Sequence, residues 1–563
     1  MSTNVEPPAT VEKNVNTTGG TTPDSSDSPR SEARFEDEIP YTIFTPWERK
    51  FIVLAASLSA IFSPMSTTIY LPALNQLASD LHVSDAQINL TVTTFLILQG
   101  LAPALIAGFS DTAGRRPAYM ICFTLYLAAN IGLAIQRNYA ALLVLRCLQS
   151  AGSSGTVALA QGVVADIVTS AERGKYVGWT SATSIAGPIL GPILGGLLAQ
   201  YGGWPWIFYF LIILTGAFLV PFVLFFPETC RKVVGDGSVP PPKLNMCLTN
   251  VIKERSRKKA GIEIDTQQSE EVRRNYKLSI PNPLSTFKIV ADKESALILF
   301  SSGLVVACLY AVNTALPSQF KKIYGFDEIQ IGLCFLPFGA GSIISAFTTG
   351  KMIDFSWRRH AKRAGFPVMK NRHQDLTHFP IERARLVVAL PLLYFCCAGL
   401  ITYGWVLDFE TSLAGPLVVL FFTGYGIMAG FQIMIILIVD LSPGNAAAAT
   451  AANNIFRCLI GAGATAAIVP MIDAWNVGWA YTFAAFTWIA LSPMLLVLLK
   501  YGPRMRLAKK EKLAQSISQH GEMPVERRTD DSHVGMTRTR RLEEGIAADD
   551  KAPEPVRNAD AKA

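Results

Sequence analysis

Residues 205–227, PWIFYFLIILTGAFLVPFVLFFP, contain no charged side chain. A helix of about 20 apolar residues crosses the hydrocarbon core of a bilayer, so this stretch predicts a transmembrane helix. Eleven further apolar runs flank it along the chain. Five precede it, and six follow a polar stretch from Glu228 to Lys293. They lie at roughly 50–71, 87–109, 118–136, 139–167 and 175–200, and at roughly 294–316, 329–350, 384–406, 412–439, 444–470 and 477–500. The sequence therefore predicts an all-α polytopic membrane protein with 12 transmembrane helices.

The composition supports the same class. Of 563 residues, 50% are hydrophobic and 17% are charged, whereas soluble domains carry about 25% charge. This excludes a secreted disulfide scaffold, a coiled coil and a disordered chain. Nine cysteines show no C-x-x-C spacing and are interpreted as small core residues. The chain lacks a G-x-x-x-x-G-K-[ST] nucleotide loop and paired metal-binding histidines. We expect a protein that is not an enzyme and needs no cofactor or metal.

The net charge of +7 reflects membrane topology rather than nucleic-acid binding, because the basic residues gather in loops beside apolar runs. The linker 228–293 holds 13 Lys and Arg, and the loop 351–385 holds nine, against three in all loops of the other side. By the positive-inside rule, both termini are cytosolic. The predicted domains are a disordered N-tail 1–47, a six-helix half 48–228, a cytosolic linker 229–293, a second six-helix half 294–500 and a C-tail 501–563.

An internal repeat relates the two halves. The sixth run opens with GGWPWIF (Gly202–Phe208), and the twelfth opens with VGWAYTF (Val477–Phe483). The loop after the second run reads GFSDTAGRR (108–116), and the loop after the eighth reads GKMIDFSWRR (350–359). Such repeats are typical of transporters whose binding site lies between two pseudo-symmetric halves.

The first of these loops contains Asp111, Gly114, Arg115 and Arg116. Gly114 permits a tight turn. The loop resembles the major facilitator superfamily signature G-x-L-x-D-R-x-G-R-R, with Ala107 and Thr112 in place of the first Gly and the first Arg. The resemblance implies a conformational latch on the cytosolic side, in which Asp111 faces the start of helix 11 and Asp166 pairs with an arginine of the loop. The matching residues of the second half are Asp354, Arg358, Arg359 and Asp440.

Two arginines lie inside apolar runs, where a charge is costly and should face the interior or a wet cavity. Arg146 belongs to R-x-x-Q-S-A-G, which resembles a family motif implicated in proton transfer; the alternative for Arg146 is snorkelling to the outer interface. Arg457 lies near mid-membrane and is our best candidate for cavity chemistry. The predicted proton or substrate cavity comprises Arg146, Gln149, Asn313, Gln432, Asn453, Asn454 and Arg457.

The fifth apolar run contains the most specific motif of the sequence. It reads GPILGPILGG, with Gly187, Pro188, Gly191, Pro192, Gly195 and Gly196. Glycines four residues apart line one helical face and allow a neighbouring backbone to approach closely. The full pattern resembles the antiporter motif of facilitator-type exporters, which favours export over import. The segments LPA at 71–73 and PET at 227–229 resemble those of twelve-span drug:proton antiporters. The patterns D-x-x-W-R-R at 354–359 and N-N-x-x-R-C at 453–458 resemble the fungal quinidine-resistance-type branch of that family.

These features predict efflux of drug-like xenobiotics or secondary metabolites, as in multidrug resistance, by alternating access and proton antiport. The expected partners are a small amphiphilic substrate, H⁺ and the lipid bilayer, and the protein is expected to be a monomer in the plasma membrane. Helices 1, 2, 3, 5, 7 and 8 hold no Asp, Glu or His deep in the apolar run, so proton coupling follows from the resemblance alone. The alternatives are a narrow-substrate transporter of polyamines, organic acids or other metabolites, a non-transporting sensor, and an internal membrane as location.

Overall fold

The computed structural model describes residues 42–168, 173–235, 237, 239–242, 245–251, 290–363, 365, 379–442 and 446–520. All regular elements in these ranges are helical. They belong to one compact unit, Thr42–Ala563. The predictions for residues 1–41, for most of the linker and for 521–563 lie outside the described residues.

The N-terminal group of helices begins with a broken first span. It comprises α1 (Pro46–Ser59), α2 (Phe62–Thr68), the 3₁₀ turn η1 (Leu71–Ala73) and α3 (Leu74–Asp80). The hydroxyls of Ser59 and Ser66 donate to the carbonyls of Ala56 and Phe62, both at 2.6 Å. Such back-bonds bend helices. The apolar run predicted at roughly 50–71 is present as one span, Pro46–Asp80, and it is broken into these shorter helices. The group continues with α4 (Asp85–Ala113), α5 (Arg115–Ile135), α6 (Tyr139–Ile167), α7 (Arg173–Gly202) and α8 (Pro205–Phe225).

A short helix, α9 (Arg231–Val234), opens the linker, and the C-terminal group follows. It comprises α13 (Lys293–Tyr324), α14 (Glu328–Arg363), α15 (Ile381–Asp408), α16 (Ala414–Asp440) and α17 (Ala446–His520). Asn476, with φ 69° and ψ 166°, breaks α17 into two spans. Ten described segments are long and apolar enough to cross a membrane. One of them contains this break, and the 30-residue α7 adds a further span. The predicted all-α fold with twelve spans in two six-helix halves is confirmed.

Two helices extend beyond their predicted ends. α14 continues from the predicted end near 350 to Arg363, so that Asp354, Arg358 and Arg359 lie on a helix and not in a loop. α17 continues past residue 500, where the predicted tail begins, to His520. Hydropathy detects only the part of a helix inside the bilayer, and charged residues outside it can extend the same helix.

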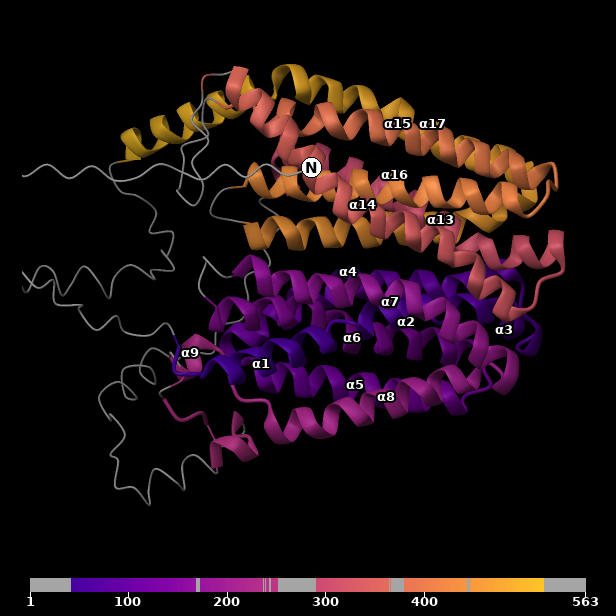
Figure 1. Ribbon diagram of the computed structural model, residues 1–563, viewed down its shortest axis with the longest axis horizontal. Coiled ribbons are helices and arrows are strands. Elements are labelled where there is room, and N and C mark those ends of the chain that lie inside the picture. The colour runs from indigo at the N-terminus through magenta and orange to yellow at the C-terminus, as the bar shows by residue number, and fades with distance from the viewer. Residues whose placement is uncertain are drawn as a thin grey trace, which may run out of the picture. The chain divides into compact units, whose positions relative to one another are not determined.

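Figure 1 shows the two groups side by side, with α4 and α7 of the N-terminal half next to the C-terminal half. The halves meet along two seams, where α7 packs on α14 and α4 packs on α17. The first seam pairs the fifth span (α7) with the eighth (α14), and the second pairs the second span (α4) with the eleventh (the first part of α17). The internal repeat requires these two pairings. A continuous apolar core crosses between the halves and includes Ile207, Leu211, Ile298 and Ile331.

Candidate functional site

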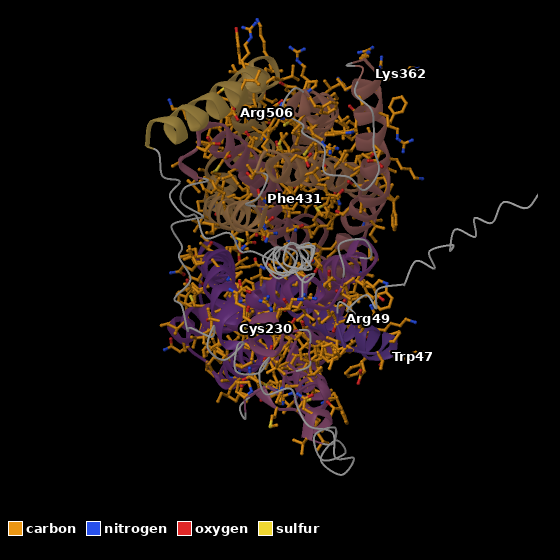
Figure 2. The ribbon with its side chains drawn as sticks, turned by 90° about the vertical axis from the view of Figure 1, so that its left-hand side faces the viewer. Trp47, Arg49, Cys230, Lys362, Phe431 and Arg506 are labelled. Atoms are coloured by element: carbon orange, nitrogen blue, oxygen red, sulfur yellow. The ribbon has the colours of Figure 1, made fainter. Side chains whose placement is uncertain are left out.

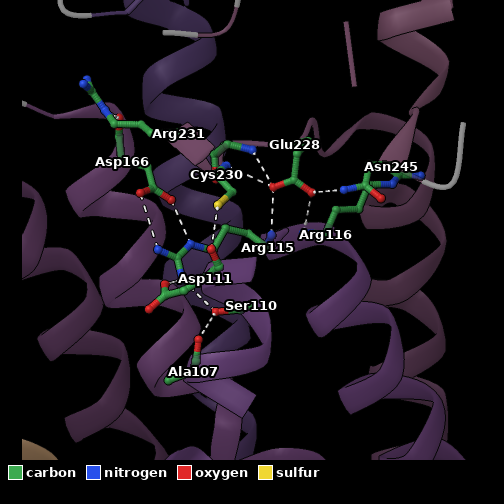
Figure 3. A network of polar contacts seen from close by, with 11 residues as sticks. Ala107, Ser110, Asp111, Arg115, Arg116, Asp166, Glu228, Cys230, Arg231 and Asn245 are labelled. Atoms are coloured by element: carbon green, nitrogen blue, oxygen red, sulfur yellow. Dashed lines mark hydrogen bonds and ion pairs between the residues drawn. The ribbon is translucent and has the colours of Figure 1, made fainter. Parts of the chain in front are cut away.

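A charge cluster joins three helices of the N-terminal half where α5 begins (Figure 3). We term this the linker end of the bundle. Arg115 Nε donates to Asp166 Oδ2 of α6 at 2.8 Å. Arg115 Nη1 donates to Asp111 Oδ1 at 2.6 Å and to Ser110 Oγ at 2.7 Å, both on α4. The side chains of Arg115 and Asp166 are 11% exposed, whereas that of Asp111 is 51% exposed. One guanidinium therefore fixes the ends of α4, α5 and α6 relative to one another.

Asp111 thus pairs within its own half. The expectation that it faces the start of helix 11 involves residues 443–445, which lie outside the described residues. Gly114 turns the chain between α4 and α5 with φ 111°. A Cβ atom at Gly114 would lie 2.5 Å from Asn245 and from Glu228, so only glycine fits this turn.

Glu228 lies at the centre of a second network that the sequence did not identify as a site. Its Oε1 accepts from the backbone N–H groups of Arg115, Thr229 and Cys230 at 2.7, 3.0 and 3.0 Å. Its Oε2 accepts from Arg116 N–H at 3.1 Å and from Asn245 Nδ2 at 2.9 Å. Glu228 is 2% exposed. Burial raises the pKa of Glu228, and these backbone N–H donors oppose the rise.

The carboxyl of Glu228 therefore caps the N-terminus of α5, where an anion is stabilised by the helix dipole. Asn245 also donates to Ala113 O at 3.1 Å, so the start of the linker is tied to the same turn. Cys230 is buried beside it, and burial raises the pKa of its thiol to about 11. The only sequence signal was an acid directly after the sixth span, in the PET segment.

Arg116 caps a different helix. Its Nη1 and Nη2 donate to the carbonyls of Phe226 and Val223 at 2.5 and 2.6 Å, at the C-terminal end of α8. A cation at this end of a helix satisfies its unpaired carbonyls. Arg116 therefore holds α8 against α5 within the N-terminal half.

The C-terminal half repeats the ion pair. Arg385 Nε, near the start of α15, donates to Asp440 Oδ2 at the end of α16 at 3.0 Å. This pair occupies the positions of Arg115 and Asp166 in the repeat. Arg385 also stacks 4.5 Å from the Trp357 ring. The other three predicted latch residues of this half, Asp354, Arg358 and Arg359, are exposed on α14.

The glycine motif of α7 makes close backbone contacts on two sides. Cβ atoms at Gly191 and Gly195 would collide with Thr68 and with the Ile69 carbonyl of the broken first span, and one at Gly187 would lie 2.9 Å from Met65 N. On the other side, a Cβ at Gly196 would collide with the Glu328 carbonyl of α14. The Pro192 carbonyl lies 2.5 Å from the Cβ position of Gly332, whereas Pro188 is exposed. The motif thus allows contact with helix 1 and with the opposite half at once.

Arg146 lies inside the N-terminal half and is fully buried. Its guanidinium lies 4.1 Å from the centre of the Tyr70 ring and 4.4 Å from that of Phe95. Nη1 donates to Gln149 Oε1 at 2.6 Å, and Gln149 in turn donates to Asn130 Oδ1 at 2.8 Å. Snorkelling of Arg146 to the outer interface is therefore not observed.

Arg457 lies at the seam between α17 and α4. Its Nη2 donates to Asn454 Oδ1 at 2.6 Å, and Asn454 Nδ2 donates across the seam to Gln99 O at 3.1 Å. The guanidinium lies 5.8 Å from the centre of the Phe431 ring of α16. Viewed from the linker end, Phe431 lies in the part of the C-terminal half nearest the N-terminal half (Figure 2).

The remaining polar candidates divide between these regions. Asn453, next to Asn454, has a buried Oδ1 without a hydrogen-bond partner, as has Asn313 on α13. Gln432 is half-buried on α16 beside Phe431. Asn453, Asn454 and Arg457 thus lie close together on α17, whereas Arg146 and Gln149 bond to each other and to Asn130 within the N-terminal half.

Comparisons with known proteins agree with this architecture. The sequence model of the Major Facilitator Superfamily matches residues 56–466. The "MFS-type transporter phiD" of "Fungal sp." is 51% identical over 481 residues, which cover 85% of this chain and 72% of the relative. The "MFS-type transporter tstD" of Talaromyces stipitatus is 46% identical, with 84% and 85% covered. "Citrate exporter 1" of Aspergillus niger is 33% identical, with 86% and 91% covered.

Among solved structures, the xylose transporter XylE from E. coli in a partially occluded inward-open conformation matches with a TM-score of 0.55. The match covers 80% of this chain and 97% of XylE at 15% sequence identity. Similarity at this level concerns the fold alone.

Proposed function

Because this chain belongs to the Major Facilitator Superfamily, we propose that it is a multi-pass membrane transporter that exports drug-like xenobiotics or secondary metabolites in exchange for protons. The two halves would rock about their seams and expose a central site to each side in turn. In this proposal the chain is a carrier and not an enzyme. It lies in the plasma membrane, acts as a monomer and has both termini in the cytosol.

The observation that carries the direction of transport is the α7 motif. Its glycines bring the α7 backbone against helix 1 on one side and against α14 on the other. The motif resembles that of exporters, and this resemblance supports the outward direction. The relatives named as transporters support transport itself, and the one named as a citrate exporter supports the outward direction.

We assign the linker-end ion pairs to the mechanics of this cycle. Arg115 with Asp166, and Arg385 with Asp440, fix helix ends within each half. Gly114, Arg116 and Glu228 lock α5 and α8 together. Each half can then move as a rigid body, which alternating access requires. Asp111, half-exposed, is the member of the cluster that can reach the other half.

The test is efflux from drug-sensitive yeast that expresses the full chain, with a panel of amphiphilic toxins and with or without a protonophore. We expect lower accumulation of at least one toxin, and we expect the protonophore to abolish the difference. Cells with the empty vector provide the control. Unchanged accumulation of every toxin, with the protein confirmed at the membrane, would contradict the broad drug-exporter proposal. Efflux that persists with the protonophore would contradict proton exchange.

The narrow-substrate alternative has one specific observation in its favour. The relative named as a citrate exporter is 33% identical to this chain over 490 residues, which cover 86% of it. An organic-acid exporter is therefore the second candidate.

A further inference from the structure

The described spans have an uncompensated positive charge in the membrane interior. Arg146 and Arg457 are both placed there, and each guanidinium contacts amides and aromatic rings. Among the described residues, no carboxylate pairs with either one. The acidic residues Asp166 and Asp440 lie at helix ends and pair with other arginines. Arginine remains protonated in proteins, so both side chains carry a positive charge. An anionic ligand could supply the negative charge that the described residues do not place beside them.

The two arginines differ in access. Arg146 is fully buried between two aromatic rings inside one half, so a ligand between the halves cannot reach it. Arg457 is partly exposed and lies at the seam, where Asn454 bonds to the backbone of α4. Tyr310 of α13 packs on Gly461, one turn beyond Arg457. Arg457 is therefore the cation that can meet a ligand.

Unpaired hydrogen-bond acceptors accompany this cation. Asn453 lies four residues before Arg457 and on the same helix face; it is 4% exposed, and its Oδ1 has no partner. Across the seam, Gln99 Nε2 donates to Ser63 and Thr67, but Gln99 Oε1 is buried without a partner. A buried polar atom without a hydrogen-bond partner destabilises the folded protein. Both oxygens lie beside the seam that Asn454 closes onto Gln99 O. A donor such as a hydroxyl group can therefore reach them only when the halves part at this seam.

We propose that the substrate is a hydroxylated organic anion whose acidic group binds Arg457 between the halves. Its hydroxyl groups donate to Asn453 Oδ1 and Gln99 Oε1, and its carbon skeleton packs on Phe431 and Tyr310. This rests on the proposed transport function and specifies its substrate class. Cationic amphiphiles are excluded from this site because like charges repel.

Binding to the purified full-length protein tests the proposal, with three probes on one skeleton: 6-hydroxy-2-naphthoate, its methyl ester and the corresponding naphthylmethylamine. Citrate serves as an acid without the aromatic skeleton. Affinities are obtained from ligand-dependent thermal stabilisation. We expect at least one acid to bind at least tenfold more tightly than the ester and the amine. Arg457→Gln should weaken acid binding at least tenfold, and Arg457→Lys should weaken it less.

Lys322→Gln removes a charge from an exposed position and is the matched control. Thermal midpoints without ligand show whether each variant is folded. Three outcomes overturn the proposal: the ester or the amine binds as well as the acid, Arg457→Gln binds the acid like the wild type, or neither acid binds.

Transport of the same probes in proteoliposomes separates this inference from the general function. Transport of the amine or the ester, without transport of the acids, would leave an exporter but overturn the anion site. Transport of no probe by a folded, inserted protein that also fails in the yeast assay would overturn the transporter function itself.

Discussion

The substitution Glu228→Gln tests the network that joins α5, α8 and the linker. The carboxylate of Glu228 accepts five hydrogen bonds, three at Oε1 and two at Oε2. A glutamine amide in its better orientation keeps the three bonds at Oε1. Its NH₂ group then faces two donors, the Arg116 N–H and Asn245 Nδ2. Both of these bonds are lost.

The size of the effect follows from those two bonds. A hydrogen bond to a charged group contributes about 1.5–3 kcal/mol. Losing two such bonds should lower the free energy of unfolding by at least about 3 kcal/mol. At about 2 °C per kcal/mol, the thermal midpoint of the purified protein should fall by about 6 °C. Toxin efflux in yeast should fall as well, because α5 and α8 no longer move together.

The matched control is Glu410→Gln in the exposed turn between α15 and α16. It makes the same chemical change without a buried network, and the midpoint should change by less than about 1 °C. An unchanged midpoint for Glu228→Gln would refute the assignment of Glu228 as the cap of α5. An equal loss in both variants would show that the effect is unrelated to these bonds.

Two further predictions concern the seams and the ion pairs. Gly195→Ala places a Cβ against the Ile69 carbonyl, so we expect a loss of about 1–3 kcal/mol from overpacking and reduced efflux. Gly216→Ala on α8 has open space around its Cβ and should retain stability and efflux; equal behaviour of the two in thermal unfolding and yeast efflux would contradict the contact. Asp166→Asn breaks a pair that is 11% exposed on both sides and should cost about 3 kcal/mol, whereas Asp440→Asn, at 25% exposure, should cost about 1 kcal/mol. Denaturation of both variants in mixed micelles compares them, and a larger loss for Asp440→Asn would contradict the ranking.

The sequence predicted the twelve spans because bilayer thickness fixes the length of an apolar run. It did not predict the break in the first span, since that depends on serine hydroxyls that bond to the backbone of their own helix. It also placed the end of α14 near residue 350, about three and a half turns before the helix ends at Arg363. Beyond the hydrocarbon core, helix propensity and not hydropathy decides where a helix ends.

The candidate sites divide in a similar way. The pairing of Asp166 with a loop arginine was accessible from the signature loop, and the structure identifies the partner as Arg115. In the second half, the symmetric choice of Arg358 and Arg359 missed Arg385, which is on the next helix. Glu228 could not be recognised, because four of its five donors are backbone N–H groups, which leave no mark on the sequence.

The two seams are related by the internal repeat but differ in chemistry. At the seam of α7 and α14, Gly196 and Gly332 lie against backbone carbonyls. At one end of this seam the Glu328 N–H of α14 donates to Gln200 Oε1 of α7 at 3.2 Å. Where the glycines meet the opposite backbone they contribute no side chain, and we infer that this surface can slide. At the seam of α4 and α17, Asn454 bonds to the carbonyl of Gln99, and Arg457 extends beside it. A contact formed by backbone alone cannot select a ligand, whereas a guanidinium among unpaired amide oxygens can. We therefore place motion on the first seam and recognition of the substrate on the second.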